Sequence, residues 1–440
     1  MRKQRRSRAA GAPNDDRRQV RVHVAVVYGL LALVGFLMLL LWSILNHQSF
    51  ELKAEHRATL EEELPSIVAL TRGSLIEGNL IEIGQNGEFF DRLLPDLLSA
   101  KETIHVETYV WWTGDICRRV AEVLAAKAKE GVEVRLLVDW AGGQKLERDL
   151  ESMMLDGGVE IARFHPPSLR AIGRFNARTH RKVIVLDGRL GYVFGHGFAD
   201  EWTGHAQDRE HYRDTFARVR GPLVNQLQGV FFENWLEVTR KLPFGEQYFP
   251  TIEPAGEVEA HVAYISSTGD VSAIEVLYYG VIASATREVV IQNPYFVAEG
   301  LGLELFKQAV ARGVSVKVML PSVESTDNAI VQHASHRHFE DLLAAGVEIY
   351  EYDRTLLHQK VIVVDRLWSS IGSANFDDRS FELNDEVQLG VVDPGIARQL
   401  IAAWEDDLRF ARRIDLEEWR RRDWWHRLKD RLAYSINEQL

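Results

Sequence analysis

The hydrophobic and polar positions of this 440-residue chain follow the same order more than once. A stretch with helical periodicity ends at a glycine and leads directly into a β-branched apolar run. This helix-to-strand step occurs at 118–138 and 301–320, and the end of a second such step occurs at 157–161 and 345–349. Alternating helices and strands predict an α/β fold. The repetition predicts two similar α/β sandwich halves in a pseudo-two-fold arrangement.

The same patterns divide the chain into segments. We expect a basic N-terminal segment at 1–23, a transmembrane helix at 24–45, a polar connector at 46–75, a first half at 76–245 and a second half at 246–440. The second half ends in a helix-like stretch, 415–432, that is rich in Trp and Arg. Tryptophan with arginine is typical of a membrane interface, and an ordinary surface helix packed on the second half explains the stretch equally well.

The segment 24–45 contains 22 residues and no charge. A helix of this length spans about 33 Å, enough for one bilayer core. A buried core helix is rarely apolar on every side for so long, and the residues at 46–50 make a poor signal-peptide cleavage site. We therefore expect an uncleaved single-pass anchor in the cell inner membrane. Because eight Lys/Arg precede it, the N-terminus is expected in the cytoplasm and the catalytic region on the opposite side.

The net charge of −12 is unevenly distributed. Residues 1–23 hold eight basic and two acidic residues, which leaves 44 basic against 62 acidic residues in the remainder. An acidic body argues against non-specific binding to duplex nucleic acid, which needs a basic surface. The single cysteine, Cys117, excludes an internal disulfide and argues against a Cys/His zinc site.

Each half contains the same spaced triad of polar residues beside an apolar run. The triads are His180, Lys182 and Asp187 in the first half and His358, Lys360 and Asp365 in the second. Residues two apart in a strand share a face, so each histidine is paired with a lysine. Imidazole can act as nucleophile, base or acid, and lysine supplies charge for an anion. A lone His-x-Lys is usually an exposed polar pair, whereas two copies in register predict one active site built from two halves.

The two aspartates have two possible roles. Asp187 is followed by Gly188, which is a hairpin-turn signal. This position suits a carboxylate that accepts bonds from local backbone at least as well as one that takes part in the chemistry.

The two His-x-Lys-x4-Asp motifs resemble those of the phospholipase D superfamily, and most closely those of bacterial cardiolipin synthases. The resemblance extends from about Gly78 to the C-terminus. It includes Arg178-Thr179-His180, Ala199-Asp200-Glu201-Trp202, Arg213-Asp214-Thr215, Asn293-Pro294-Tyr295-Phe296, Gly372-Ser373-Ala374-Asn375 and Arg379-Ser380.

The resemblance implies that the two histidines flank one phosphodiester. One histidine attacks phosphorus and forms a phosphohistidine, and the other protonates the leaving alcohol. In the family the histidine of the first motif is usually the nucleophile, which favours His180. Lys182, Lys360 and Asn375 would bind the non-bridging oxygens, so no metal or other cofactor is expected. Each histidine needs an acceptor for its other ring nitrogen, and the expected acceptors are Asp214 and Glu386, both downstream of their motifs.

One position departs from the family pattern. The first copy reads Gly195-His196-Gly197-Phe198, with Gly197 where the second copy keeps Asn375. The first half is therefore expected to make one phosphate contact fewer, or to use His196 instead.

The sequence as a whole predicts a membrane-anchored phosphatidyltransferase resembling cardiolipin synthase. It would convert two molecules of phosphatidylglycerol, an anionic phospholipid, to cardiolipin and glycerol. The alternatives are a lipid hydrolase, a phosphodiesterase or nuclease of the same superfamily, and an inactive membrane scaffold. The apolar span and the acidic body favour a lipid partner over nucleic acid.

Overall fold

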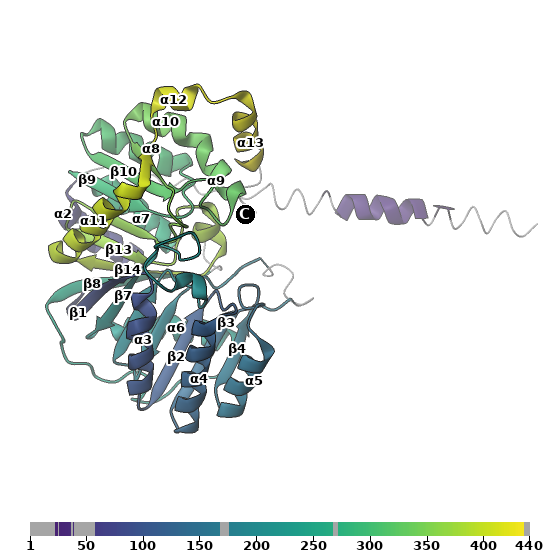
Figure 1. Ribbon diagram of the computed structural model, residues 1–440, viewed down its shortest axis with the longest axis vertical. Coiled ribbons are helices and arrows are strands. Elements are labelled where there is room, and N and C mark those ends of the chain that lie inside the picture. Colours follow the sequence, from purple (N-terminus) through teal and green to yellow (C-terminus); the bar gives the residue numbers. More distant parts are fainter. Residues whose placement is uncertain are drawn as a thin grey trace, which may run out of the picture. The chain divides into compact units, whose positions relative to one another are not determined.

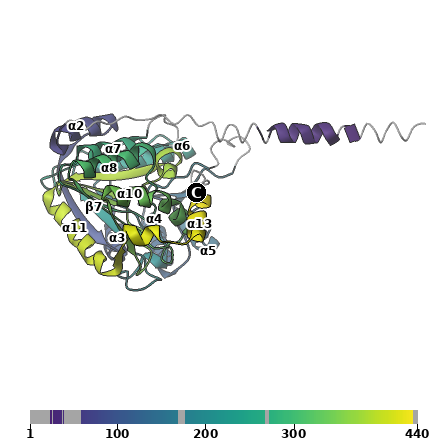
Figure 2. The ribbon, with the colours of Figure 1, turned by 90° about the horizontal axis from the view of Figure 1, so that it is seen from above.

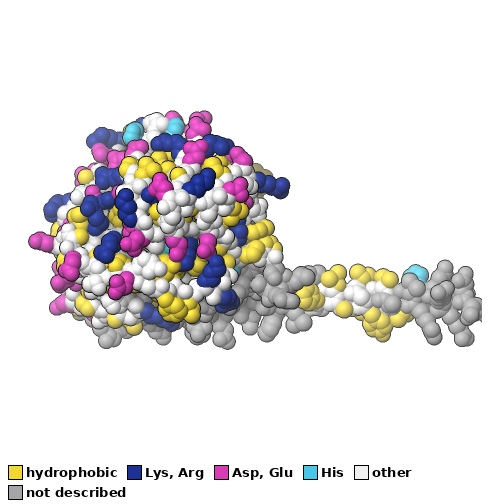
Figure 3. Space-filling model, turned by 90° about the horizontal axis from the view of Figure 1, so that it is seen from below, with side chains coloured by type: hydrophobic (Ala, Val, Ile, Leu, Met, Phe, Trp, Pro, Cys, Tyr) yellow, Lys and Arg dark blue, Asp and Glu magenta, His cyan; other side chains and the backbone are white. Residues whose placement is uncertain are grey.

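The computed structural model describes residues 23–24, 26–36, 38, 58–167, 176–266 and 272–434. The chain forms two compact units, residues 1–51 and 52–440. In the first unit, the described residues 23–24, 26–36 and 38 are helical. Figure 3 shows apolar side chains along this helical segment, in contrast to the mixed charges on the larger unit.

Among the described residues, no helix is both long enough and apolar enough to cross a lipid bilayer. Much of the predicted transmembrane segment 24–45, namely residues 25, 37 and 39–45, lies outside the described residues. The basic segment 1–22 and the connector residues 46–57 lie outside them too.

Helices and strands alternate through the larger unit, as the hydrophobic pattern predicts. After α2 (Leu60–Leu70), its first half contains β1 (Ile76–Gln85), α3 (Glu88–Ser99), β2 (Thr103–Thr108), α4 (Asp115–Lys129), β3 (Glu133–Asp139), α5 (Arg148–Gly157), β4 (Glu160–Phe164), β5 (Val183–Leu186), β6 (Leu190–Phe194), the 3-10 turn η2 (Asp200–Trp202), β7 (Thr215–Arg220) and α6 (Val224–Thr239).

The second half repeats this series and adds elements at its end. It contains β8 (Val258–Ile265), α7 (Ala273–Ser284), β9 (Glu288–Gln292), α8 (Gly300–Ala311), β10 (Ser315–Pro321), α9 (Ala329–Ser335), η3 (His336–His338), α10 (Phe339–Ala345), β11 (Glu348–Tyr352), β12 (Val361–Val364), β13 (Trp368–Gly372), the π-helical turn η4 (Arg379–Leu383), β14 (Glu386–Val392), α11 (Pro394–Asp407), η5 (Leu408–Phe410), β15 (Ala411–Arg413), α12 (Leu416–Arg420) and α13 (Trp424–Tyr434).

Among the described residues, the strands form one mixed 15-stranded sheet that repeats the same order on either side of its centre. Antiparallel β1 and β8 join the halves. Outward from this pair the order is β7-β6-β5-β2-β3-β4 in the first half and β14-β13-β12-β9-β10-β11-β15 in the second. In each half the two outer pairings of the repeat are parallel, and the others are antiparallel. The predicted α/β class is confirmed, and the strand order repeats on the two sides of the sheet.

Helices cover the outer faces of the two halves (Figure 1). The first outer core lies under α3, α4 and α5, and the second under α2, α7, α8 and α10. A third core contains α6 and α11 together with strand residues from both halves. Figure 2 shows α2 next to α7. Residues 60–70 of the predicted connector are therefore a helix packed on the second half.

The predicted hairpin turn follows β5, and its counterpart follows β12. Asp187 and Gly188 have φ angles of 52° and 60°, and Asp365 and Arg366 both have 55°. Positive φ at both central residues is the type I′ geometry, which matches the twist of the flanking strands. These hairpins, β5–β6 and β12–β13, place each His-x-Lys segment at the start of an inner strand, beside the other half.

Candidate active site between the halves

Backbone hydrogen bonds tie each predicted histidine to the opposite half. The His180 N–H donates to the carbonyl oxygen of Asp385 at 2.9 Å. In the same way, the His358 N–H donates to the carbonyl oxygen of Arg213 at 2.8 Å. Asp385 and Arg213 directly precede Glu386 and Asp214, the two predicted acceptors. The position of each histidine is therefore set by the segment that carries an acceptor in the other half.

The histidine side chains also contact the opposite half. His180 Nδ1 lies 2.9 Å from Oε1 of Glu386. His358 Nδ1 lies 2.8 Å from Oδ2 of Asp214. Each acceptor thus serves the histidine of the other half, not the motif that it follows in sequence. We call this the crossed arrangement. It leaves Nε2 of each ring to face a ligand, because Nδ1 is held by a carboxylate.

Both acceptors are fully buried and are themselves hydrogen-bonded. The hydroxyls of Ser373 and Ser380 donate to Glu386. The indole N–H of Trp202 donates to Asp214 Oδ2 at 2.9 Å. Burial raises the pKa of each carboxyl, but the neighbouring histidines and lysines outweigh it and bring both pKa values below their usual range. Both acceptors are therefore anionic at neutral pH.

Each lysine folds back over its own histidine. Lys182 Nζ donates to the carbonyl oxygen of His180 at 2.8 Å. Lys360 Nζ donates to the carbonyl oxygen of His358 at 2.5 Å and lies 3.0 Å from Nε2 of that ring. Both lysines are buried. Lys360 also lowers the pKa of Lys182, so the positive charges of the two halves act on one another.

Burial shifts the pKa values of both histidines and both lysines downwards. Burial lowers the pKa of His180 and of His358 to about 4, assisted by the adjacent lysines. It also lowers the pKa of Lys182 to about 7 and that of Lys360 to about 8. Such shifts cluster at sites where groups exchange protons or bind charged ligands. The arrangement therefore suits binding of an anion, which would restore protons to these groups.

Asn375 and Gly197 occupy corresponding positions in the two halves, but their surroundings differ. Asn375 is buried, and its side-chain Oδ1 has no hydrogen-bond partner. At Gly197, a Cβ atom would lie 2.7 Å from Val110 and 2.8 Å from Trp202. Val110 and Trp202 thus fill the space that an asparagine would need. His196 does not replace it, because its Nε2 bonds to the backbone oxygen of Asn86.

The two predicted aspartates are not brought to the histidines. The carboxylate of Asp187 accepts the N–H groups of residues 101, 102 and 103 at 2.7–3.1 Å. That of Asp365 accepts the N–H groups of residues 286, 287 and 288 and the Thr286 hydroxyl. Each lies at the far end of its strand, on the order of 20 Å from its histidine. Their interactions fix the hairpin to the neighbouring strand, β2 or β9.

Several residues of the site were not predicted from the sequence. The ring of Tyr109 meets that of His180 edge-on at 5.2 Å between centroids, and Trp202 meets His358 in the same way at 5.2 Å. Ser373 and Ser380 support Glu386. Trp202, Ser373 and Ser380 belong to segments that carried the family resemblance, so that signal was available. No signal assigned them to a particular carboxylate.

Among the described residues, the side chains that cluster closely enough to hold a metal ion are His333, His336 and Asp430. They belong to α9, η3 and α13, which carry none of the predicted site residues. At the histidine pair, burial lowers the pKa of both histidines, and the two lysines lie close enough to the rings to lower it further. The side chains around the two histidines are therefore suited to bind an anion.

Comparison with known proteins agrees with this geometry. A family model described as "Cardiolipin synthase, PLD-like domain" matches residues 93–210 and 278–408, which include both triads. The chain is 32% identical over 405 residues to the major cardiolipin synthase ClsA of Bacillus subtilis, covering 90% of this chain and 84% of that protein. It is 31% identical over 397 residues to a cardiolipin synthase of Staphylococcus aureus, covering 89% and 80%.

A solved structure shows the same fold at low sequence identity. Phosphatidylserine synthase from Haemophilus influenzae matches with a TM-score of 0.63 and 13% identity, over 82% of this chain and 95% of that one. The repeated motifs, the likeness in fold and the extent of the sequence match agree, and the chain belongs to the phospholipase D-like family of cardiolipin synthases.

Proposed function

We propose that this protein is a membrane-anchored phosphatidyltransferase that converts two molecules of phosphatidylglycerol to cardiolipin and glycerol. The observation that carries the proposal is the crossed arrangement. Two histidines from different halves each have Nδ1 held by a buried carboxylate, at 2.9 Å and 2.8 Å, and therefore keep Nε2 for chemistry. The relatives named above are cardiolipin synthases over most of this chain's length.

In the first displacement, Nε2 of His180 attacks the phosphorus of one phosphatidylglycerol. The bond from phosphorus to the glycerol headgroup oxygen breaks, and that oxygen takes a proton from Nε2 of His358. Glycerol leaves, and a phosphatidyl group remains on His180. Asp214 stabilises the imidazolium form of His358 before this transfer, and Glu386 holds His180 with its proton on Nδ1.

In the second displacement, the headgroup hydroxyl of another phosphatidylglycerol attacks the same phosphorus. His358, now neutral, takes the hydroxyl proton, and the bond from phosphorus to Nε2 of His180 breaks. Cardiolipin leaves, and both histidines return to their starting states. Because the transfer is divided into two displacements, one active site carries out both the release of glycerol and the formation of cardiolipin.

Lys182, Lys360 and Asn375 would bind the non-bridging oxygens of the phosphate. The pKa values of the lysines, about 7 and about 8, mean that burial costs them part of their charge. An anionic phosphodiester offsets that cost and favours the charged forms. The same negative charge favours protonation of His358, whose pKa burial lowers to about 4.

Residues 24–45 would form the single-pass anchor, with the N-terminus in the cytoplasm and the larger unit on the opposite side. Support comes from the eight basic residues that precede the segment and from its exposed apolar helical residues, such as Leu31 at 61% and Phe36 at 60%. In sealed inverted vesicles, we expect the larger unit to be protected from protease. Digestion there would contradict the proposed orientation.

Purified enzyme given phosphatidylglycerol with a labelled headgroup tests the reaction itself. We expect labelled glycerol and labelled cardiolipin in equal amounts, because one headgroup leaves and the other is retained. Phosphatidic acid with glycerol, and no cardiolipin, would identify a hydrolase and contradict the proposal. The His180→Ala variant is the control for contaminating activity.

A further inference from the structure

The C-terminal helix α13 has two faces of different character. Its inner face carries Asp430 and Ala433, which are 4% and 7% exposed. Its outer face carries Trp424, Trp425, Leu428 and Leu432, because these positions fall within about 100° of arc on a helix. Trp424 and Trp425 are 65% and 56% exposed and stack on one another at 4.4 Å.

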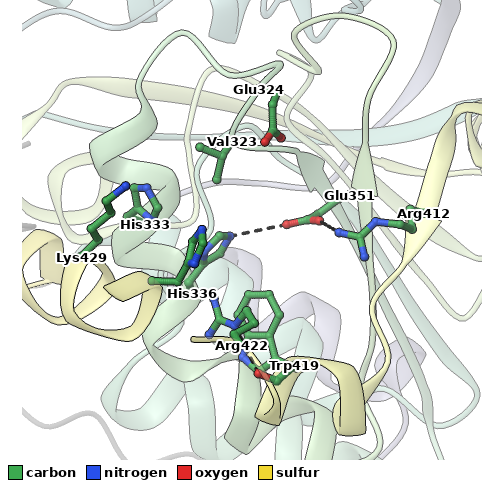
Figure 4. Close-up of a pocket in the computed structure, with 10 residues that line it drawn as sticks. Val323, Glu324, His333, His336, Glu351, Arg412, Trp419, Arg422 and Lys429 are labelled. Atoms are coloured by element: carbon green, nitrogen blue, oxygen red, sulfur yellow. Dashed lines mark hydrogen bonds and ion pairs between the residues drawn. The ribbon is translucent and has the colours of Figure 1, made fainter. Parts of the chain in front are cut away.

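The inner face is fixed to the second half by a charge-balanced cluster. Asp430 Oδ1 lies 2.8 Å from His333 Nδ1, and Asp430 Oδ2 accepts from Arg422 at 3.0 Å. His336 lies 3.5 Å from Glu351 (Figure 4). It also lies 3.4 Å from Asp430. Because Asp430 is paired with both His333 and Arg422, the cluster holds α13 in place and leaves its outer face turned away from the protein.

Further contacts next to this cluster complete the attachment. The Arg422 guanidinium lies 3.1 Å from the centre of the Trp419 ring, and Trp419 packs on Phe339 at 5.2 Å. Ala433 packs with Val297 and Ala334. The helix is therefore held rigidly, so the exposed tryptophans are a fixed feature of the surface.

The charges around the outer face are positive. Residues 420–432 contain six basic and two acidic residues, in a chain whose net charge is −12. The acidic residues are occupied, since Asp423 bonds to His426 and Asp430 belongs to the buried cluster. Exposed Arg431 and Lys429 flank the apolar stripe on its two sides. An apolar stripe with tryptophans, bordered by Lys and Arg, is the arrangement that lies at the interface of an anionic bilayer.

We propose that α13 is an interfacial helix that rests the second half on the surface of an anionic phospholipid membrane. Trp424, Trp425 and Leu432 enter the headgroup and upper acyl region, and the flanking bases meet lipid phosphates. This is a second membrane contact, separate from the anchor proposed at 24–45. It rests on the proposed function only for the choice of phosphatidylglycerol as the anionic lipid.

The test uses the full-length protein reconstituted in vesicles of phosphatidylglycerol brominated on its acyl chains, which quenches tryptophan near the bilayer. The variants are Trp424→Phe/Trp425→Phe and, as matched control, Trp404→Phe, whose side chain is only 3% exposed. We expect the lipid-quenched part of the fluorescence to fall in the double variant and to stay unchanged in the control. Because Trp42 of the proposed anchor contributes equally to all samples, the difference reports α13 alone.

The proposal would be overturned if brominated lipid quenched the same amount of tryptophan fluorescence in the double variant as in the wild type. The readout needs no turnover, so it stays interpretable if the protein does not convert phosphatidylglycerol. A kinetic arm uses Trp424→Ser/Trp425→Ser in mixed micelles. We expect a severalfold higher KM for phosphatidylglycerol with kcat unchanged, since α13 touches no reacting atom. Equal KM values for this variant and the wild type would also contradict the proposal.

Discussion

Replacing one acceptor at a time separates the two histidines, because the crossed arrangement ties each carboxylate to the ring of the opposite half. Asp214→Asn removes the negative charge 2.8 Å from His358 Nδ1. With charge centres about 4 Å apart and an effective dielectric constant of about 20, an imidazolium loses about 4 kcal/mol of stabilisation. That corresponds to about a 1000-fold slower proton transfer from His358. Glu386→Gln should act on His180 by a comparable amount.

The assay compares phosphatidylglycerol with a nitrophenyl ester of phosphatidic acid, whose leaving group departs without a proton. For the ester, kcat/KM depends only on the steps up to and including the release of nitrophenolate. We expect Asp214→Asn to lose about 1000-fold with phosphatidylglycerol and less than about tenfold with the ester. Glu386→Gln should lose similarly with both substrates, because His180 makes the bond to phosphorus in each case.

A matched control is Glu82→Gln, which removes a carboxylate on β1 that pairs with Arg218 of the neighbouring strand β7. We expect it to retain wild-type rates with both substrates. The reasoning is refuted if Asp214→Asn is equally impaired with both substrates while Glu386→Gln is spared with the ester. That result would mean that Asp214 serves the nucleophile.

Three further predictions follow from the same contacts. Asp187→Asn should lower the free energy of unfolding by about 2 kcal/mol, since a charged acceptor of three N–H groups is lost, while kcat of the folded protein changes little; urea unfolding and an assay of the folded fraction check this. Gly197→Asn should also destabilise, by about 1–3 kcal/mol, because its Cβ meets Val110 at 2.7 Å; a more stable or more active variant would contradict the packing. His180 and His358 have pKa values of about 4 in the folded protein, against an ordinary value of 6.5. Between these two pH values the unfolded chain binds more protons than the folded protein. The free energy of unfolding should therefore fall as the pH drops from 6.5 to 4. The variant His180→Gln/His358→Gln should flatten that pH dependence, and an unchanged slope would refute the assignment.

The repeated pattern predicted the architecture because strand formation here is local. The β-branched runs after Gly131 and Gly313 became β3 and β10, and the Asp-Gly pair at 187 became a type I′ turn. Both histidines, both lysines and both acceptors also meet at one site. The repeated spacing was sufficient to identify the histidines and lysines, whereas the two acceptors were expected only after the family resemblance was recognised.

The pairing of acceptor with histidine could not be predicted in the same way. Asp214 follows His180 in sequence, yet it bonds to His358, because the segment before it pairs with the segment before His358. That exchange depends on how the two halves face each other, which no local pattern encodes. The loss of an asparagine at 197 was visible in the sequence. Its cause, the space taken by Val110 and Trp202, comes from residues far apart in the chain.

The measurement that most directly tests one shared site is the location of the covalent phosphatidyl group. His358→Ala lacks the base for the second displacement, so a nitrophenyl ester of phosphatidic acid should leave one phosphatidyl group per chain. Mass spectrometry after denaturation at alkaline pH should find it on His180, and His180→Ala should carry none. A phosphatidyl group on His358 in His180→Ala, or none on either histidine in the two variants, would contradict the account.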